Sequence, residues 1–203
     1  KQFPNAAARN TFVDEFVTDD STKISWSRAL KADIGKGTQI SFDASRALPV
    51  LYRPFTRQWL YYDRDMIEYV FQVPRIFPNA GAENVVICIT GTGEAHPFSA
   101  LMVNAASEFK THYNGQNFPR FLYEEDESDG LFGTRAGNGH RRVDAITDAG
   151  LTYFQAAYPG KEITKDDLFY YVYGVLHSTD YRARYADNLR RELPRMPILK
   201  RFE

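Results

Sequence analysis

The pattern of apolar positions in the first two thirds of the chain is that of β-strands. Residues 85–90 form a nearly continuous β-branched run, which is typical of a strand covered on both faces and predicts a central strand. Shorter apolar segments, interrupted by proline and glycine, predict further strands at residues 39–42, 48–52, 56–62, 98–103 and 118–123. We therefore expect a mixed sheet within residues 1–123.

Other segments of this region carry weaker patterns. A loose helical stripe follows Asp20-Ser21 and stops at the glycines of residues 35–37; it consists of Ile24, Trp26, Leu30 and Ile34. Residues 10–20 are interpreted as a weak strand or turn, and residues 68–71 and 75–78 as short extended pieces.

The hydrophobic period becomes helical after residue 145. A Thr147 N-cap predicts a first helix up to Pro159-Gly160, and a Thr164-x-x-Asp167 capping box predicts a second, deeply packed helix. A third helix is expected to begin near Ser178 and to end before Pro194. The predicted fold class is α+β, with a mixed β-sheet region followed by a three-helix C-terminal subdomain over residues 145–203.

The segment between these two parts has a different composition. Residues 124–129 are acidic, residues 130–139 are rich in glycine, and Arg141-Arg142 follow. We expect residues 124–144 to form an exposed loop that is acidic at first and then rich in glycine and arginine.

Aromatic and arginine side chains are most concentrated in residues 51–62. Pro54 predicts a turn between two strands. Two roles are open to its arginines: pairing with carboxylates inside the protein, or contacting a nucleic acid. We expect the rings to form an architectural core that ties the sheet to the C-terminal helices, with Arg53 as a buried pairing partner and Arg57 facing outward. The expected structural residues are Trp26, Tyr52, Arg53, Phe55, Trp59 and His177, the last as a capping residue of its helix.

Composition limits the range of functions. The 203 residues carry 25 lysines and arginines and 26 aspartates and glutamates, so an interface for an anionic polymer must be a local patch. Cys88 is the only cysteine, and no apolar run is long enough to span a membrane, which together favour the cytoplasm. The start at Lys1, in sequence typical of the middle of a protein, suggests an excised part of a larger polypeptide.

Motifs for catalysis are missing. The four histidines lack partners at metal-ligand spacing, Gly91-Thr92-Gly93 lacks the third glycine of a dinucleotide loop, and the acidic run does not fit a calcium loop. We expect no catalytic residue, no metal and no cofactor in this chain. An enzyme that uses Asp63, Glu94 and His96 is the alternative, and nothing in their spacing favours it.

Cationic and amide side chains are therefore the positive evidence. Arginine suits phosphate and guanine contacts, and asparagine or glutamine suits adenine. The alternative for the arginines near the C-terminus is a solvated helical face. The candidate DNA-binding residues are Arg57, Gln58, Asn114, Gln116, Asn117, Arg120, Arg135, Asn138, Arg141, Arg142, Arg182, Arg184, Arg190 and Arg191.

Several short motifs in a fixed order resemble a known family. They are KISWS at residues 23–27, LYRPF at 51–55 with Arg57, QNFP at 116–119, DLFYYVYGVLHS at 167–178 and LPRMP at 193–197. Together they resemble the C-terminal specificity region of type ISP restriction-modification enzymes, which are large bacterial defence proteins. In these enzymes a nuclease, a helicase-like translocase, an N6-adenine methyltransferase and a target-recognition domain share one polypeptide.

The resemblance implies a function that the residues alone do not define. The chain would recognise a specific sequence in double-stranded DNA and present it to the adjacent methyltransferase. The parent protein would use S-adenosylmethionine, ATP and Mg, and the partners of the chain would be DNA and the methyltransferase and translocase domains. Residues 114–120 and 130–142 are the expected base-reading segments, and Arg53, Arg57 and the C-terminal arginines would contact the DNA backbone or pair internally. The alternative is a docking module of the same enzyme with little direct base reading.

Overall fold

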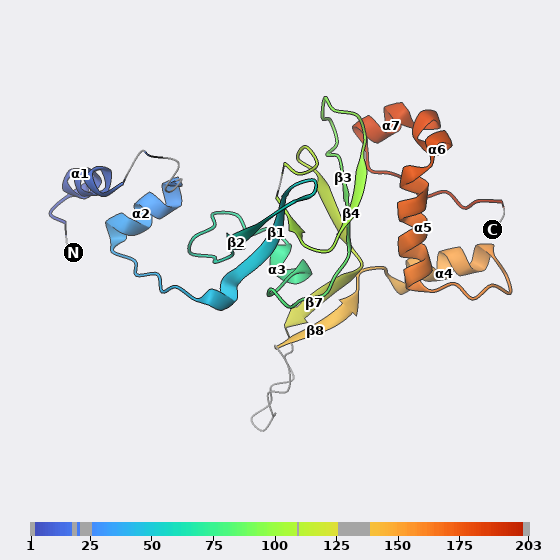
Figure 1. Cartoon of the computed structure of the whole chain (residues 1–203), viewed down its shortest axis with the longest axis horizontal. Helices are drawn as coiled ribbons and strands as arrows, with labels where there is room; N and C mark the ends of the chain where they lie inside the picture. The colour runs from blue at the N-terminus through green and yellow to red at the C-terminus, as the bar shows by residue number, and fades with distance from the viewer. Residues whose placement is uncertain (1–2, 18–19, 21–25, 109, 126–138, 201–203) are drawn as a thin grey trace, which may run out of the picture. The chain divides into compact units, whose positions relative to one another are not determined.

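The computed structural model describes residues 3–17, 20, 26–108, 110–125 and 139–200 (Figure 1). The chain divides into two compact units. Unit 1 comprises residues 1–47 and 61–71, and unit 2 comprises residues 48–60 and 72–203. Each unit is described by itself.

Unit 1 contains two helices that contact each other, α1 (Ala6–Phe16) and α2 (Arg28–Lys36). The Asn5 side chain caps α1 by accepting a hydrogen bond from the Ala8 amide, and Ser27 caps α2 in the same way. α2 ends at Gly37, which adopts the left-handed conformation that favours glycine (φ 76°).

Two predictions for unit 1 are wrong. The segment assigned to a strand or turn is α1, because an Asn cap and an alanine-rich first turn outweigh its scattered β-branched residues. Residues 39–42 form no strand. The second helix was predicted, but it begins at Arg28, and part of the expected stripe, including Ile24, lies outside the described residues.

The second part of unit 1 is organised around a buried carboxylate. Asp63 is 1% exposed, pairs with Arg46 and accepts a hydrogen bond from the Asp65 amide. The Asp65 amide and the Arg46 guanidinium lower the pKa of Asp63. Arg46 ends a short 3-10 helix, Ala44–Arg46, and its carbonyl accepts from the Tyr62 amide. The Asp63 carboxylate therefore stabilises the local structure of unit 1 through its contacts with Arg46 and the Asp65 amide.

The described residues of unit 2 form three small sheets in place of the single mixed sheet that was predicted. In the first, β1 (Ala47–Arg53) lies between β2 (Thr56–Tyr61) and β5 (Ala106–Ser107), and β1 runs parallel to β5. In the second, β3 (Val86–Ile89) lies between β4 (Ala100–Val103) and β6 (Gln116–Pro119), antiparallel to both. Every residue of β3 is buried, which confirms the predicted central strand.

The third sheet is a pair of antiparallel strands, β7 (Phe121–Glu125) and β8 (His140–Asp144). The predicted strand at residues 118–123 is therefore two strands, which belong to different sheets and meet at Arg120. The predicted loop over residues 124–144 also begins and ends in strands, while residues 126–138 lie outside the described residues. The predicted extended pieces near residue 75 are replaced by a short helix, α3 (Val73–Ile76).

The C-terminal region is helical, as predicted, but it contains four helices and not three. They are α4 (Asp148–Ala157), α5 (Lys165–His177), α6 (Thr179–Arg184) and α7 (Ala186–Arg191). The Thr147 cap and the Thr164–Asp167 capping box are both formed. The predicted third helix is broken at Tyr185, whose backbone (φ −113°, ψ 23°) is not helical.

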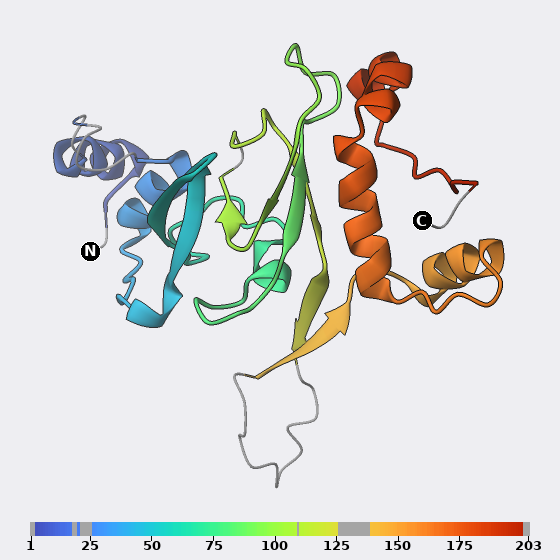
Figure 2. The same ribbon diagram turned by 45° about the vertical axis from the view of Figure 1, so that its right-hand side comes forward.

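The main core lies where α5 runs alongside β3 and β4 (Figure 2). Its buried members come from the central strands and from α5, α6 and α7: Ile87, Ile89, Ala100, Phe169, Val175, Leu176, Tyr181 and Leu189. The chain after α7 is attached by tyrosine hydroxyls, since Tyr181 donates to the Arg195 carbonyl at 2.9 Å and Tyr158 to the Leu199 carbonyl at 2.8 Å.

The predicted aromatic core of residues 51–62 is wrong. Phe55 is 88% exposed, Trp59 is 74% exposed and Tyr52 is 41% exposed. Apolar rings were expected to be buried because burial is their usual contribution to stability. Here β1 buries Leu48, Val50 and Leu51 instead, while β2 is exposed along almost its whole length.

Candidate nucleic-acid interface

Unit 2 contains an open groove of about 540 Å³ beside β4, which we call the β4 groove. Three segments line it: the turn between β1 and β2, the segment that enters β4, and the turn before β6. The lining residues are Arg53, Pro54, Phe55, Pro97, Phe98, Ser99, Ala100, Leu101, Lys110, Thr111, His112 and Tyr113.

The first wall of the β4 groove is the turn between β1 and β2. Pro54 is followed by Phe55 at φ 68°, a left-handed conformation that favours glycine and strains a bulky side chain. Arg53 pairs with Glu108 at 2.6 Å and lies 4.1 Å from the centre of the Tyr52 ring. The Arg53 side chain is 43% exposed, so the prediction that it is a pairing partner is confirmed and the prediction that it is buried is wrong.

The second wall is the turn of residues 110–115. Thr111 fixes it to β1 by donating from Oγ1 to the Leu51 carbonyl at 3.0 Å. The Tyr113 ring is stacked on His96 with ring centres 3.6 Å apart. Tyr113 and Asn114 both have positive φ values, 50° and 54°. This wall therefore combines a strained backbone with a paired ring system.

Two glycines allow this turn to pack against the end of β3. A Cβ atom at Gly91 would lie 2.4 Å from the Asn114 carbonyl oxygen, and one at Gly115 would lie 2.4 Å from the Ile89 carbonyl oxygen. Such contacts are too short for any side chain, so the backbone approach requires glycine at both positions.

His112 lies in the same wall and is 7% exposed. Its Nδ1 atom has no hydrogen-bond partner among the described residues. Burial lowers the pKa of His112 below its usual value of 6.5, so the imidazole is neutral at pH 7. A buried nitrogen without a partner is uncommon in folded proteins.

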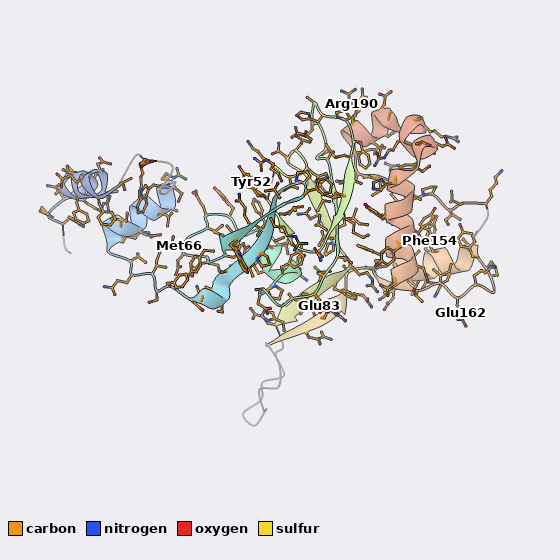
Figure 3. All side chains as sticks on the ribbon, in the orientation of Figure 1. Tyr52, Met66, Glu83, Phe154, Glu162 and Arg190 are labelled. Atoms are coloured by element: carbon orange, nitrogen blue, oxygen red, sulfur yellow. The ribbon has the colours of Figure 1, made fainter. Side chains whose placement is uncertain are left out.

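A second exposed feature, the α7 surface, consists of Gly93, Glu94, Asp187, Arg190 and Arg191. The Gly93 amide donates to the Arg190 carbonyl at 2.8 Å, which holds the loop after β3 against α7. Figure 3 shows Arg190 on the part of α7 beside this loop. Within the part of the chain that the structure describes, neither Arg190 nor Arg191 forms an ion pair, although carboxylates lie in the same depression.

Asn114 is joined to the α7 surface, because its amide group donates to Glu94. The structure thus brings together Asn114, Arg190 and Arg191, which lie far apart in the sequence. Arg184 is exposed and lies 5.7 Å from the centre of the Tyr185 ring.

Arg182 was expected on an outer face of its helix, and this is wrong. Its Nε donates to the Leu176 carbonyl, and its guanidinium lies 5.6 Å from the centre of the Phe98 ring. Arg182 therefore joins the end of α5 to the segment that leads into β4. His177, which was expected to cap α5, is its last residue, and its ring packs on Tyr173 with centres 4.5 Å apart.

The candidate DNA-binding residues on strands differ in their exposure and in their hydrogen-bond partners. Arg57 donates to the Asn104 side chain at 2.7 Å, and the neighbouring Gln58 is exposed. On β6, Gln116 is exposed, while Asn117 donates to Ser107 Oγ at 3.0 Å. Trp26, the remaining predicted structural residue, packs edge-on against Phe16 in unit 1.

Arg120, whose side chain is buried, lies in an ion-pair cluster that we call the Arg120 junction. Its Nη1 contacts Asp144 and its Nε contacts Asp166, both at 2.5 Å, and its side chain is 7% exposed. Lys165 adds contacts to Asp144 at 3.2 Å and to Asp148 at 2.6 Å. Hydrogen bonds from Arg120 and Lys165 lower the pKa of Asp144. The junction joins the residue between β6 and β7 to β8 and to the starts of α4 and α5, so Arg120 stabilises the fold.

The β7–β8 pair contributes two exposed arginines. Arg141 pairs with Glu124 on the facing strand at 2.9 Å, and the Arg142 guanidinium lies 4.3 Å from the centre of the Phe121 ring. Arg135 and Asn138, which were predicted to contact DNA, lie outside the described residues.

Sequence reasoning missed the groove residues Lys110, His112 and Tyr113. The signal was present in the run of residues 110–115, where a cation and two rings precede an Asn-Gly pair typical of a turn. It was missed because the neighbouring groove wall comes from residues more than fifty positions earlier.

Two features are absent from the described residues. No group of three or more histidine, cysteine, aspartate or glutamate side chains is placed to hold a metal ion. In the same residues, no helix has both the length and the apolar character needed to cross a bilayer.

Comparisons with known proteins identify the family. The solved structures that are similar to this chain include three complexes with DNA or a DNA substrate mimic. The first is a nuclease-deletion mutant of the Type ISP restriction-modification enzyme LlaGI in complex with a DNA substrate mimic, with 35% identity, a TM-score of 0.70, and coverage of 94% of this chain and 15% of that one. The second is the ATP-dependent Type ISP enzyme LlaBIII bound to DNA, with 25% identity, a TM-score of 0.76, and coverage of 95% and 12%.

The third is a complex of DrdV with DNA, with 32% identity, a TM-score of 0.76, and coverage of 97% of this chain and 19% of that one. The chain therefore spans less than a fifth of the length of each of these proteins. No match was found among curated proteins. A family model described as the Type ISP C-terminal specificity domain matches residues 1–203. The chain belongs to the Type ISP C-terminal specificity domain family.

Proposed function

We propose that this chain recognises a specific sequence in double-stranded DNA, as the specificity domain of a Type ISP restriction-modification enzyme. The observation that carries the proposal is the match of the specificity-domain model to the whole chain. It is supported by three similar structures, each a complex with DNA or a DNA mimic, at TM-scores of 0.70 to 0.76.

The proposed contacts follow from exposure and pairing. Five of the candidate arginines are exposed and form no ion pair with a described residue, so they are available to phosphates: Arg57, Arg142, Arg184, Arg190 and Arg191. The amides of Gln58 and Gln116 are exposed and are the better candidates for reading bases, because Asn114 and Asn117 already donate to Glu94 and Ser107. Arg120 is left out, since two carboxylates occupy its buried guanidinium.

The role of the whole polypeptide is also a proposal. By likeness to its relatives, the chain would belong to a cytoplasmic enzyme with nuclease, translocase and N6-adenine methyltransferase domains that use Mg, ATP and S-adenosylmethionine. Recognition would place the target so that the methyltransferase reaches an adenine turned out of the duplex.

A second candidate function is docking of this chain against those other domains. It is favoured by two large exposed rings on the C-terminal helices, Tyr153 (63% exposed) and Tyr170 (53% exposed), which lie outside the surfaces described above. Exposed aromatic side chains are frequent anchors of protein interfaces.

Selection from a pool of randomised duplexes, followed by filter binding over a salt series, separates the two functions. Sequence recognition predicts enrichment of one motif, and tighter retention of that duplex than of a scrambled duplex of the same composition. A steep fall in affinity with salt is expected, because phosphate contacts release counterions. Equal and negligible retention of both duplexes would refute DNA recognition and leave docking as the function.

A further inference from the structure

We propose that the β4 groove holds a single nucleotide of a DNA strand whose base has left the helical stack. The inference rests on the proposed function, since it names the part of the DNA that one surface of the chain receives. It is carried by the strained turns, the aromatic side chains that line the groove and the charge of the lining.

The first observation is the backbone conformation of Phe55 and the exposure of its ring. With Pro54 before it and φ at 68°, Phe55 occupies the position of a turn at which glycine is the favoured residue. Its ring is 88% exposed, so neither backbone preference nor burial accounts for phenylalanine here. A flat ring held on a short turn offers a face on which a base can stack, provided that the base is free of its own neighbours.

The second observation is that the wall formed by residues 110–115 is held in place and is also aromatic. Tyr113 lines the groove, is 45% exposed and is fixed by its stack on His96. The close approach of Gly91 and Gly115 holds this turn against β3. A preformed site loses less conformational entropy on binding than a mobile one.

The third observation is the charge of the lining. Two cations, Arg53 and Lys110, line the groove, and none of the lining residues is acidic. Arg53 is partly neutralised by Glu108, whereas Lys110 forms no ion pair with any residue that the structure describes. An exposed ammonium group beside an aromatic wall suits the phosphate of a nucleotide whose base lies on the rings.

The fourth observation is the size of the groove. The volume of about 540 Å³ lies within the range of small-ligand sites.

The experiment measures fluorescence anisotropy of labelled duplexes with the whole chain and with two matched variants. The duplexes are identical except that one carries a single unpaired nucleotide. Phe55→Gly removes the ring and relieves the backbone. Phe71→Gly is the control, because Phe71 is also exposed at 73% with φ 47° but does not line the groove.

The expected result is that the wild-type chain and Phe71→Gly bind the duplex with the unpaired nucleotide about 10-fold more tightly than the paired one, given the usual strength of stacking between a base and an aromatic ring. Phe55→Gly is expected to lose this preference while its melting temperature stays the same or rises. Lys110→Gln is expected to weaken binding of the same duplex and to reduce its salt dependence.

Other outcomes overturn the inference. If Phe55→Gly keeps the wild-type preference, or if the wild-type chain shows none, the groove does not take an unstacked nucleotide, while sequence recognition of paired DNA still stands. Competition by free deoxynucleoside monophosphates, without any preference for the unpaired duplex, would assign the groove to a free nucleotide instead.

If the wild-type chain binds no duplex at all, the proposed function fails, and a single-stranded oligonucleotide then decides the inference separately. Binding of that oligonucleotide that is lost in Phe55→Gly supports the nucleotide site. Absence of such binding refutes it.

Discussion

The Arg120 junction and the α7 surface both place arginine side chains near carboxylates, but only the junction forms ion pairs among these residues. At the junction, carboxylates contact Arg120 at 2.5 Å and the guanidinium is buried. On α7, Glu94 and Asp187 line the same depression as Arg190 and Arg191, yet no ion pair forms among these residues and both arginines are exposed. An arginine serves the fold when its partners reach it and exclude water, and otherwise remains available to an external anion.

The largest effect is expected at the junction. Arg120→Met should destabilise the chain by about 2 kcal/mol, because it removes two charge-assisted hydrogen bonds from a guanidinium that is only 7% exposed. The measurement is chemical denaturation followed by circular dichroism. Arg141→Ala is the matched control, since its pair with Glu124 is exposed and such pairs contribute about 1 kcal/mol or less. Equal losses for the two variants would contradict the distinction between the buried and exposed arginines.

A smaller effect, on binding alone, is expected on α7. Replacing both Arg190 and Arg191 by alanine should lower affinity for all duplexes alike and reduce the slope of log affinity against log salt by about 2, for two lost phosphate contacts. The free energy of unfolding should change by about 0.5 kcal/mol or less. Arg195→Ala provides the control, because Arg195 pairs with Glu192 at 2.9 Å. An unchanged slope in the double variant would remove α7 from the DNA interface.

The turn between β1 and β2 should gain stability when its ring is removed. Phe55→Gly is expected to raise the free energy of unfolding by about 1 kcal/mol, because glycine adopts φ 68° without strain. Phe55→Ala removes the same ring but keeps a Cβ atom, so the difference between the two variants isolates backbone strain. Thermal unfolding of both variants measures it, and a glycine variant less stable than the alanine variant would disprove strain at this turn.

The smallest effect concerns pH. Because burial lowers the folded pKa of His112 below 6.5, the imidazole is neutral in both states above that value and makes no pH-dependent contribution there. As pH falls below 6.5, His112 becomes protonated in the unfolded chain but stays neutral in the folded chain. The free energy of unfolding therefore decreases. We expect His112→Asn to remove part of the loss in unfolding free energy between pH 7.5 and pH 5.5. An identical pH dependence in the variant would show that His112 is solvated.

Local signals in the sequence predicted the C-terminal helices best. The Thr164–Asp167 capping box lies within a single turn, and both of its hydrogen bonds are formed in the structure. The strand of residues 85–90 was equally clear, because a continuous β-branched run has few alternatives to burial. In both places the residues that determine the element are neighbours in sequence.

The site was harder to predict because its determinants are distant in sequence. Arg120 lies in a segment that was expected to read bases, and only the fold brings Asp144 and Asp166 to it. Phe55 and Trp59 looked like core residues because the pattern cannot tell an apolar ring that packs from one that is exposed for a ligand. The break at Tyr185 likewise lacks the glycine or proline that usually ends a helix.

Gly91, which follows β3, and Gly115, which precedes β6, also limit which residues of the groove can change during evolution. Since any side chain at Gly91 or Gly115 would collide with a backbone carbonyl, a relative that keeps this groove must keep both glycines. The residues that face the opening, such as Phe55 and Lys110, carry no such restriction. Relatives with different target sequences should therefore share the two glycines while they exchange the side chains around them.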